Sequence, residues 1–218
     1  MRKLLDGYRR FQTGIYPRER ALFKTLAQGQ HPLALFITCA DSRVVPDLIT
    51  QTGPGDLFIC RNVGNLIPDH GSMNGGVSAT IEYAVGVLGV KDVIICGHSD
   101  CGAIKGVLQP ETTAGFANVQ AWLKHAVIPE HLMDDRTLSP EERLAALIEG
   151  NVVGQLTHLR THPAVAARLA RGDIGLHGWV YLIETGEIRA YDAEKGCFAP
   201  LDASNARVTK DGMEPPGR

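Results

Sequence analysis

The 218-residue sequence lacks a charge excess and long apolar runs. It has 22 Lys and Arg against 24 Asp and Glu, a formal net charge of −2. This balance offers no basic patch for nucleic acid or an anionic membrane as the main partner. The longest apolar runs, such as residues 33–37, have strand length and fall far short of the ~20 residues that span a bilayer. The basic first ten residues are not followed by an apolar segment, so no secretory signal is predicted.

Cysteines are also sparse and odd in number. They are Cys39, Cys60, Cys96, Cys101 and Cys197. A disulfide scaffold of this size would be denser, so reduced thiols in the cytoplasm are predicted. Cys60 and Cys96 lie within apolar strand-like runs and, with Cys197, are interpreted as structural.

What the sequence does contain is an alternation of short apolar runs and helical patterns, without an internal repeat or a domain linker. Strands are predicted at residues 33–37, 56–61, 92–96, 179–183 and 188–191, the last two as a hairpin. An amphipathic helix is predicted over 77–88, and the capping box of Ser139 and Glu142 starts another that runs to about Arg160. We therefore expect an α/β fold: a mostly parallel central β-sheet flanked by helices, with an antiparallel C-terminal edge strand.

The organisation predicted around this sheet is a single domain, residues 1–205. Its first 30 residues form an N-terminal helical arm, because apolar residues recur there at helical spacing. The polar, proline-containing residues 206–218 are expected to form a flexible tail.

Two predicted strands end in residue types that bind metals. The first runs out into Cys39, and the third into His98 and Cys101, at the strand ends where parallel sheets hold their ligands. His98 and Cys101 are three apart and are expected to share one face at the start of a helix. One His and two thiolates suit Zn²⁺ and leave a fourth position open, as in catalytic zinc sites. Taken singly, each of these residues is more often a core residue than a ligand.

An acid and a base follow the first of these residues. Asp41 and Arg43 flank one serine, and a turn there would let the two side chains pair. A paired Asp stays ionised at neutral pH and can orient a metal-bound water. The alternative is a surface ion pair without a function.

At these residues the sequence resembles the β-class carbonic anhydrases, most closely their bacterial and plant-like branch. Residues 39–43, Cys-Ala-Asp-Ser-Arg, are similar to the family's first motif, and residues 97–102, Gly-His-Ser-Asp-Cys-Gly, to its second. Residues 55–65, 81–85 and 177–181 also match, and the resemblance spans roughly residues 3 to 200.

This resemblance implies zinc-dependent reversible hydration of CO2 to bicarbonate and a proton, by zinc-bound hydroxide oriented by an Asp-Arg dyad. It assigns one Zn²⁺ per chain to Cys39, His98 and Cys101, and makes Asp41 and Arg43 the dyad. It also implies a small substrate pocket, some of it reached across a dimer interface. The pocket residues are Gln30, Phe58, Val63, Tyr83 and Gly102. The helical arm is expected to wrap a second copy, giving a dimer, tetramer or octamer.

One position departs from part of the family. Some members are switched by bicarbonate held by a Trp, an Arg and a Tyr, and this sequence matches with Arg61 and Tyr181 but has Phe36 at the Trp position. We therefore expect an enzyme without this switch, with Asp41 on Arg43 rather than on zinc. His70, a loop histidine, is a candidate for proton transfer.

Two alternatives stay open at this point. One keeps the fold and metal but hydrolyses carbon disulfide or carbonyl sulfide. The other is a non-catalytic zinc-binding domain, against which Gln30, Asp41 and Arg43 argue.

Overall fold

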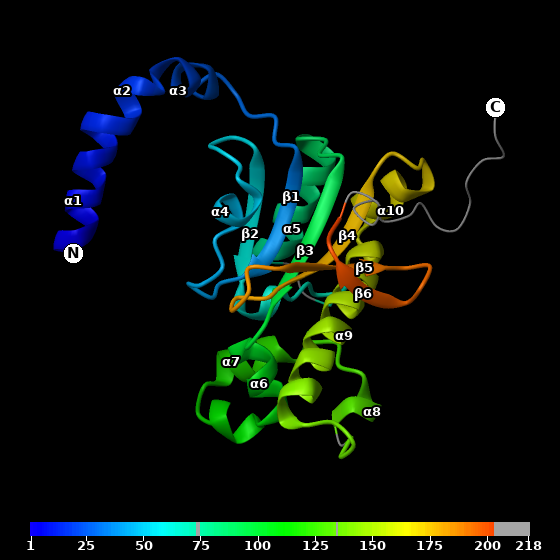
Figure 1. Cartoon of the computed structure of the whole chain (residues 1–218). Coiled ribbons are helices and arrows are strands. Elements are labelled where there is room, and N and C mark those ends of the chain that lie inside the picture. The colour runs from blue at the N-terminus through cyan, green and yellow to red at the C-terminus, as the bar shows by residue number, and fades with distance from the viewer. Residues whose placement is uncertain (73–74, 134, 203–218) are drawn as a thin grey trace.

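The computed structural model describes residues 1–72, 75–133 and 135–202 and is built on a six-stranded sheet of order β2-β1-β3-β4-β5-β6 (Figure 1). The strands are β1 (Ala34–Cys39), β2 (Leu57–Asn62), β3 (Asp92–His98), β4 (Gly175–Tyr181), β5 (Ile188–Asp192) and β6 (Cys197–Pro200). The first four pair in parallel and the last two antiparallel, which confirms the predicted α/β fold. The expected tail, 206–218, lies outside the described residues.

The C-terminal part of the sheet is larger than the sequence predicted. The hairpin is confirmed, since β4 and β5 pair antiparallel, but β4 begins at Gly175 and also runs parallel to β3. A further antiparallel strand, β6, pairs with β5. Its four residues are too few to show a pattern in the sequence.

The two faces of the sheet are covered unequally. Helices α5 (Gly76–Glu82), α9 (Pro140–Thr161) and α10 (Pro163–Ala170) pack with one face and form the main core with Leu35, Ile95 and Leu176. The opposite face carries a small cluster around Phe36 and Ile94, with α4 (Pro46–Thr50) beside it. Strand β1 is buried along its whole length, which explains why its sequence is apolar apart from Thr38.

Helix α9 starts where the sequence predicts. Ser139 accepts a hydrogen bond from the Glu142 amide, and the Glu142 carboxylate accepts one from the Ser139 amide. The helix reaches Thr161 and runs from below the carboxyl ends of the strands up toward α10 (Figure 1). Its buried face includes two polar residues, Asn151 and Gln155, beside apolar residues such as Ile148 and Val152.

Shorter helices surround the carboxyl ends of the parallel strands. They are α6 (Gly102–Leu108), the 3₁₀ turns Val63–Asn65 and Pro110–Thr113, α7 (Ala117–Leu123) and α8 (Glu130–Met133). The helix predicted over 77–88 is α5 continued by a π-helical turn, Tyr83–Val87. No helix in the described part of the chain combines the length and apolar character needed to cross a bilayer.

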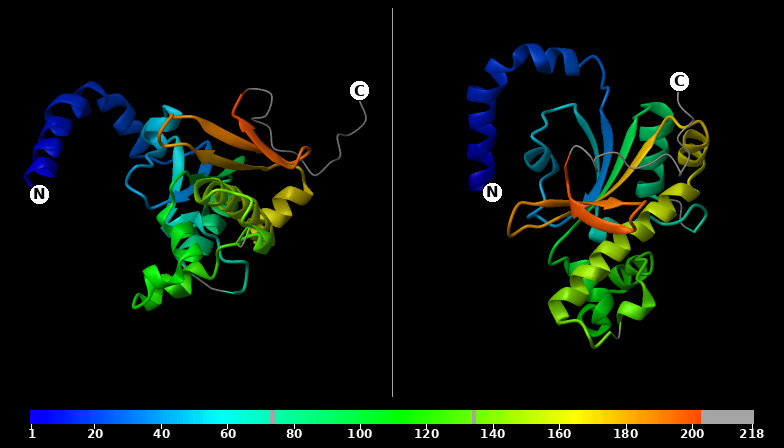
Figure 2. Two further views of the ribbon diagram at one scale, coloured as in Figure 1. Left: turned by 60° about the horizontal axis from the view of Figure 1, so that its bottom comes forward. Right: turned by 45° about the vertical axis from the view of Figure 1, so that its right-hand side comes forward.

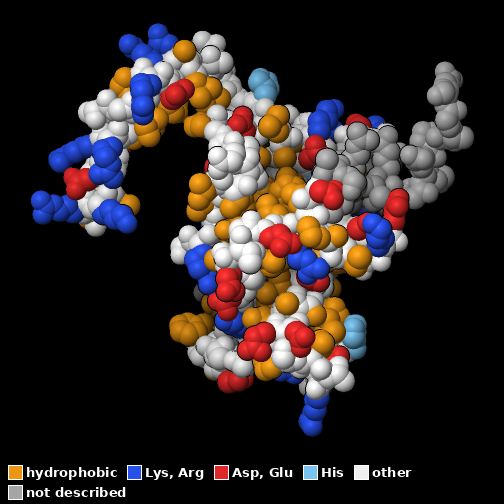
Figure 3. Space-filling model, in the orientation of Figure 1, with side chains coloured by type: hydrophobic (Ala, Val, Ile, Leu, Met, Phe, Trp, Pro, Cys, Tyr) orange, Lys and Arg blue, Asp and Glu red, His pale blue; other side chains and the backbone are white. Residues whose placement is uncertain are grey.

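The N-terminal arm is helical, as predicted, and stands away from the sheet (Figure 2). It consists of α1 (Arg2–Arg10), a π-helical turn (Phe11–Ile15), α2 (Tyr16–Arg18) and α3 (Arg20–Leu26). None of these elements contains a buried residue. Hydrophobic side chains line the arm and the neighbouring surface of the body (Figure 3).

Candidate metal centre and active site

Three metal-ligand residues converge where β1 and β3 end. Cys39 is the last residue of β1, His98 is the last residue of β3, and Cys101 is the N-cap of α6. One ligand atom from each lies within 4.8 Å of the others, and the three residues form the one such group found among the described residues. Because β1 and β3 pair in parallel, their carboxyl ends lie side by side and bring the two loops together.

The reason that His98 and Cys101 meet differs from the one predicted. They do not share a helix face, because His98 still belongs to β3. Between them Asp100 has a positive φ of 59°, which turns the chain back so that Cys101 returns to the end of the strand. Asp tolerates this left-handed conformation better than most residues.

The histidine is prepared to bind a metal through one nitrogen. His98 is fully buried, and its Nδ1 lies 2.8 Å from the Ser99 carbonyl oxygen. That oxygen can only accept, so Nδ1 carries the proton and Nε2 keeps its lone pair. Among the described residues, no hydrogen-bond partner reaches Nε2. A buried imidazole nitrogen left in this state fits a metal ligand.

The two thiols also favour a cation. Cys101 hydrogen-bonds to Cys39 and lowers the pKa of the Cys39 thiol against the opposing effect of burial, and the Gly64 amide, 3.3 Å from Cys39 Sγ, acts in the same direction. The same contact and burial raise the pKa of Cys101. The Cys39 thiolate therefore forms easily, whereas the Cys101 thiolate needs a positive charge beside it. Two sulfurs and one imidazole fit Zn²⁺ in number and kind.

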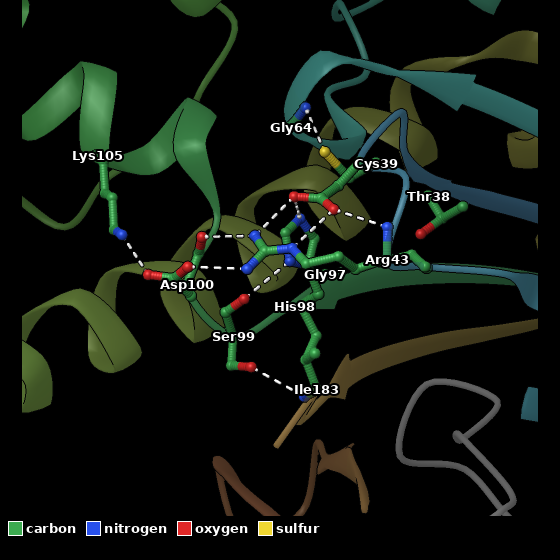
Figure 4. Close-up of polar contacts among 12 residues, drawn as sticks. Thr38, Cys39, Arg43, Gly64, Gly97, His98, Ser99, Asp100, Lys105 and Ile183 are labelled. Atoms are coloured by element: carbon green, nitrogen blue, oxygen red, sulfur yellow. Dashed lines mark hydrogen bonds and ion pairs between the residues drawn. The ribbon is translucent and has the colours of Figure 1, made fainter. Parts of the chain in front are cut away.

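Asp41 and Arg43 form the expected ion pair next to this centre, and Figure 4 shows the Arg43 side chain there. Arg43 Nη2 lies 2.8 Å from Asp41 Oδ2, and Arg43 Nε lies 3.0 Å from Asp41 Oδ1. The guanidinium holds the pKa of the Asp41 carboxyl well below its usual range, so the group is ionised at neutral pH. Asp41 Oδ2 lies 3.9 Å from His98 Nε2, so the carboxylate borders the site that a metal would fill.

Asp100 is a site residue to which the sequence analysis assigned no role. Its carboxylate accepts from Arg43 Nη1 at 2.9 Å and pairs with Lys105 on α6 (Figure 4). These contacts anchor the side of the guanidinium that faces away from Asp41. An acidic residue beside a ligand, within the second motif, was the available signal.

Of the three positions that match the bicarbonate switch, two hold the matching residues, Arg61 and Tyr181, and the Trp position holds Phe36. Phe36 is fully buried with its ring edge-on to Trp179, the centroids 6.0 Å apart. Arg61 donates to the carbonyl oxygens of Asp41 and Val44, each at 2.7 Å. Phe36 has no polar hydrogen to offer an anion.

The pocket residues separate into two groups within one chain. Val63 and Gly102 adjoin the centre, since Gly64 contacts Cys39 and Gly102 follows Cys101. Phe58 instead pairs with Leu35, four residues before Cys39, a distance of about 13 Å along a strand. Its ring stacks on Tyr83, with centroids 5.9 Å apart.

Gln30 precedes β1 at the end opposite to Cys39. One chain therefore does not bring Gln30, Phe58 and Tyr83 to its own metal ligands.

The remaining cysteines lie outside the centre. Cys60 and Cys96 are buried, as the interpretation as core residues requires, and burial raises the pKa of the Cys96 thiol to about 12. Cys197 is exposed at the start of β6. His70, the proton-transfer candidate, packs edge-on against His162 with centroids 5.9 Å apart.

A parallel sheet whose strand ends gather Cys, His and Cys beside an ionised carboxylate is typical of metal-dependent enzymes. The family profile described as carbonic anhydrase matches residues 34–188. The chain belongs to this family and is an enzyme. Family membership thus excludes the alternative of a non-catalytic zinc domain.

Relatives that align with most of the chain are also named carbonic anhydrases. A carbonic anhydrase of Pseudomonas aeruginosa is 48% identical over 99% of this chain and 98% of its own length. Carbonic anhydrase 1 of Escherichia coli O157:H7 is 45% identical over 95% of both.

The solved structures agree. That of the β-carbonic anhydrase CcaA has a TM-score of 0.88 and 43% identity, covering 93% of this chain and 92% of that one. That of the Coccomyxa β-carbonic anhydrase, in complex with acetazolamide, has a TM-score of 0.73 and 32% identity, covering 86% and 84%.

Proposed function

We propose that this protein catalyses the reversible hydration of CO2 to bicarbonate and a proton, with zinc held by Cys39, His98 and Cys101 and with Asp41 and Arg43 as the catalytic dyad. The observation that carries the proposal is the position of the Asp41 carboxylate. It lies 3.9 Å from the free His98 nitrogen and is bound on both oxygens by Arg43. It is thus placed to act beside the metal without being a ligand.

When bound, zinc supplies a Lewis acid that lowers the pKa of a water molecule, so that hydroxide becomes available near neutral pH. The chain's own contribution begins with the three ligands. Cys39 and Cys101 become thiolates, and His98 binds through Nε2 because Nδ1 is held by the Ser99 carbonyl. The three residues would hold the metal and leave it accessible to a water molecule.

The dyad orients that water. An ionised Asp41 can accept only, so a water beside it points one hydrogen at the carboxylate and turns a lone pair toward CO2. Arg43 keeps the carboxylate ionised and off the metal, and its backbone amide donates to Asp41 Oδ1 at 2.9 Å. Asp100 holds Arg43 from the other side.

CO2 is neutral and nearly apolar, so its pocket needs small apolar walls and few polar groups. Val63 and Gly102 supply one side of this pocket in the same chain. We propose that Phe58, Tyr83 and Gln30 of a second copy supply the other side, with Gln30 donating to a substrate oxygen. Tyr83 and Val63 are 45% and 44% exposed in one chain, which leaves both free to face a partner.

A second copy would also cover the arm. Leu4, Leu5 and Tyr8 on α1 are more than half exposed in one chain. Burial of such surfaces between copies is the usual basis of stable dimers. We propose a homodimer as the minimal unit, from which a tetramer or octamer can be built. Two Sordaria macrospora β-carbonic anhydrases, one of them 28% identical at a TM-score of 0.80, are described as tetrameric.

A cytoplasmic location is proposed because the centre needs two free thiols, and Cys39 and Cys101 form no disulfide. The absence of an indole donor at Phe36 further suggests an enzyme that bicarbonate does not switch off.

The test is stopped-flow CO2 hydration against pH, with zinc per chain measured on the same sample. We expect one zinc per chain and fast turnover that rises smoothly with pH, with or without added bicarbonate. If the zinc-loaded protein hydrates no CO2 but hydrolyses carbonyl sulfide, carbonyl sulfide would replace CO2 as the proposed substrate. A steep, bicarbonate-promoted collapse near neutral pH would show that the switch exists.

A further inference from the structure

Trp122, on α7, is hydrogen-bonded to the turn beside the metal centre. Its indole Nε1 donates to the Val63 carbonyl oxygen at 2.7 Å, across 59 residues of sequence. The ring also forms one wall of a groove of about 370 Å³ with Val63, Asn118 and Val119. Packing against the groove residues would explain an aromatic side chain at this position, but it would not explain the direction of the N–H group.

The Val63 carbonyl and the Gly64 amide belong to one peptide group. The described chain has no cis peptide, so this carbonyl and this N–H point in opposite directions from one plane. The N–H end donates to Cys39 Sγ at 3.3 Å (Figure 4). Indole, peptide and sulfur therefore form a continuous chain of two hydrogen bonds, with the peptide as the central link. A donor on the carbonyl polarises the peptide and strengthens the bond that its N–H gives.

The other side of Gly64 is also fixed. Its φ is +83°, and a Cβ atom there would lie 2.8 Å from Ala103 Cβ, so only glycine allows this approach. The Gly64 carbonyl accepts from Asn151 Nδ2 of α9 at 3.4 Å, and Asn151 is buried. The turn is thus held from α7 on one side and from α9 on the other.

We propose that Trp122 is a positioning residue for the metal centre: through the Val63–Gly64 peptide it aims an N–H group at the Cys39 sulfur and so sets the charge and orientation of that ligand. The proposal rests on the zinc site proposed above and adds a residue outside the ligands and the dyad. A hydrogen bond to a thiolate draws charge from the sulfur and fixes its lone pairs, and partners of this kind tune metal sites.

Loss of the indole donor has two expected effects. The Cys39 thiolate is less fixed before the metal arrives, so the metal is held less firmly. Its sulfur is also richer in charge, so that sulfur-to-metal charge transfer needs less energy. Neither effect needs a change in the ligands themselves.

The experiment uses full-length Trp122→Phe, which keeps an aromatic ring and removes the N–H. Zinc loss to excess chelator is timed on the zinc-loaded protein, and the charge-transfer band is recorded on the cobalt-substituted protein. We expect zinc to leave about three- to tenfold faster, below the 10- to 100-fold typical of direct partners of a ligand, because Trp122 acts through one peptide. We expect the cobalt band to move to longer wavelength.

Val119→Ala is the matched control. It removes apolar surface from the same groove wall and touches neither hydrogen bond. It is expected to match wild type in both readouts, which separates loss of packing from loss of the donor. If Trp122→Phe does not fold, replacement of Trp122 by 3-benzothienylalanine provides the same test, since sulfur takes the place of the N–H in a ring of nearly equal shape.

If the Trp122 variants lose zinc at the wild-type rate and their cobalt band does not move, the proposal is overturned while the proposed function stands. A shift of equal size in Val119→Ala would also overturn it, because packing would then be the cause. Wild-type protein that takes up neither zinc nor cobalt would instead contradict the proposed function itself.

Discussion

The metal loops and the N-terminal arm differ in how far one chain satisfies them. At the loops, Cys39, His98 and Cys101 are 6%, 0% and 1% exposed, and Asp41 is held by Arg43 on both oxygens. In the arm, by contrast, Leu4, Leu5 and Tyr8 are 70%, 52% and 58% exposed. The difference supports the proposal that one chain holds the metal ligands and the dyad, whereas a second copy covers the arm and completes the far side of the pocket.

The largest effect is expected at the metal loops, which one chain satisfies. Cys101→Ala removes one of the three proposed ligands and leaves Cys39 without its thiol partner. We expect loss of bound zinc and a fall in CO2 hydration of roughly 10³-fold or more, because the metal-activated water is lost. Metal analysis and stopped-flow kinetics on one preparation measure both.

Cys60→Ala is the matched control for this change. Cys60 is 8% exposed, and it lies on β2 away from the centre. Retention of zinc by Cys101→Ala, or its loss from Cys60→Ala, would contradict the assignment of the ligands.

The second-largest effect distinguishes the role of the dyad from that of the metal. Asp41→Asn keeps the shape of the side chain and removes its charge, so the water loses its anionic acceptor. We expect kcat to fall by about 10²- to 10³-fold with zinc retained. An unchanged kcat would show that Asp41 is only a surface ion-pair partner.

Acid stability provides a second reading of Asp41. Arg43 lowers the pKa of this carboxyl in the folded protein, so the pair stabilises the fold above the unfolded pKa of about 3.9 and ceases to do so as pH falls through the lower folded value. Asp41→Asn should therefore lose less stability than wild type below about pH 4. Activity between pH 6 and 9 should contain no titration of Asp41.

The arm gives a smaller effect that depends on concentration. Leu5→Asp with Tyr8→Asp places charge on the exposed apolar side of α1. We expect dimer dissociation to become easier by about tenfold or more, as for loss of a buried apolar contact in an interface. Light scattering measures the assembly, and Lys3→Asp on the same helix controls for added negative charge. Equal assembly by all three proteins would show that the arm does not join copies.

The smallest effect is expected at Asp100. Asp100→Asn keeps a residue that tolerates the positive φ and weakens only the outer support of Arg43. Since the pair is exposed and Asp41 still holds the guanidinium, kcat should fall by only about two- to fivefold. A loss as large as that of Asp41→Asn would mean that Asp100 belongs to the dyad.

The sequence was most informative where chemistry restricts the residue type. Cys39, His98 and Cys101 could be found because few other residues bind zinc and because both motifs follow predicted strands. The way in which His98 and Cys101 meet could not be found, since it depends on the left-handed backbone of Asp100. The capping box at Ser139 was predictable because it is formed by local hydrogen bonds.

The contacts that join distant segments were not predictable. Trp122 and Asn151 reach the turn at Gly64 from 59 and 87 residues away, and in the sequence both are ordinary helix residues. Phe58 and Tyr83 look like core residues, and only the family resemblance gave them a role. Whether they serve a second copy depends on an assembly that no local pattern encodes.

The measurement that tests the shared site most directly is complementation. Cys101→Ala lacks the metal but keeps the proposed partner residues, whereas Gln30→Ala with Tyr83→Ala keeps the metal and lacks two of those residues. Each variant alone should be nearly inactive. If two copies build each pocket, mixed dimers from co-unfolded and refolded chains contain one intact site, and an equal mixture should recover about a quarter of wild-type CO2 hydration. Activity no greater than the mean of the two separate variants would show that each pocket is built by one chain.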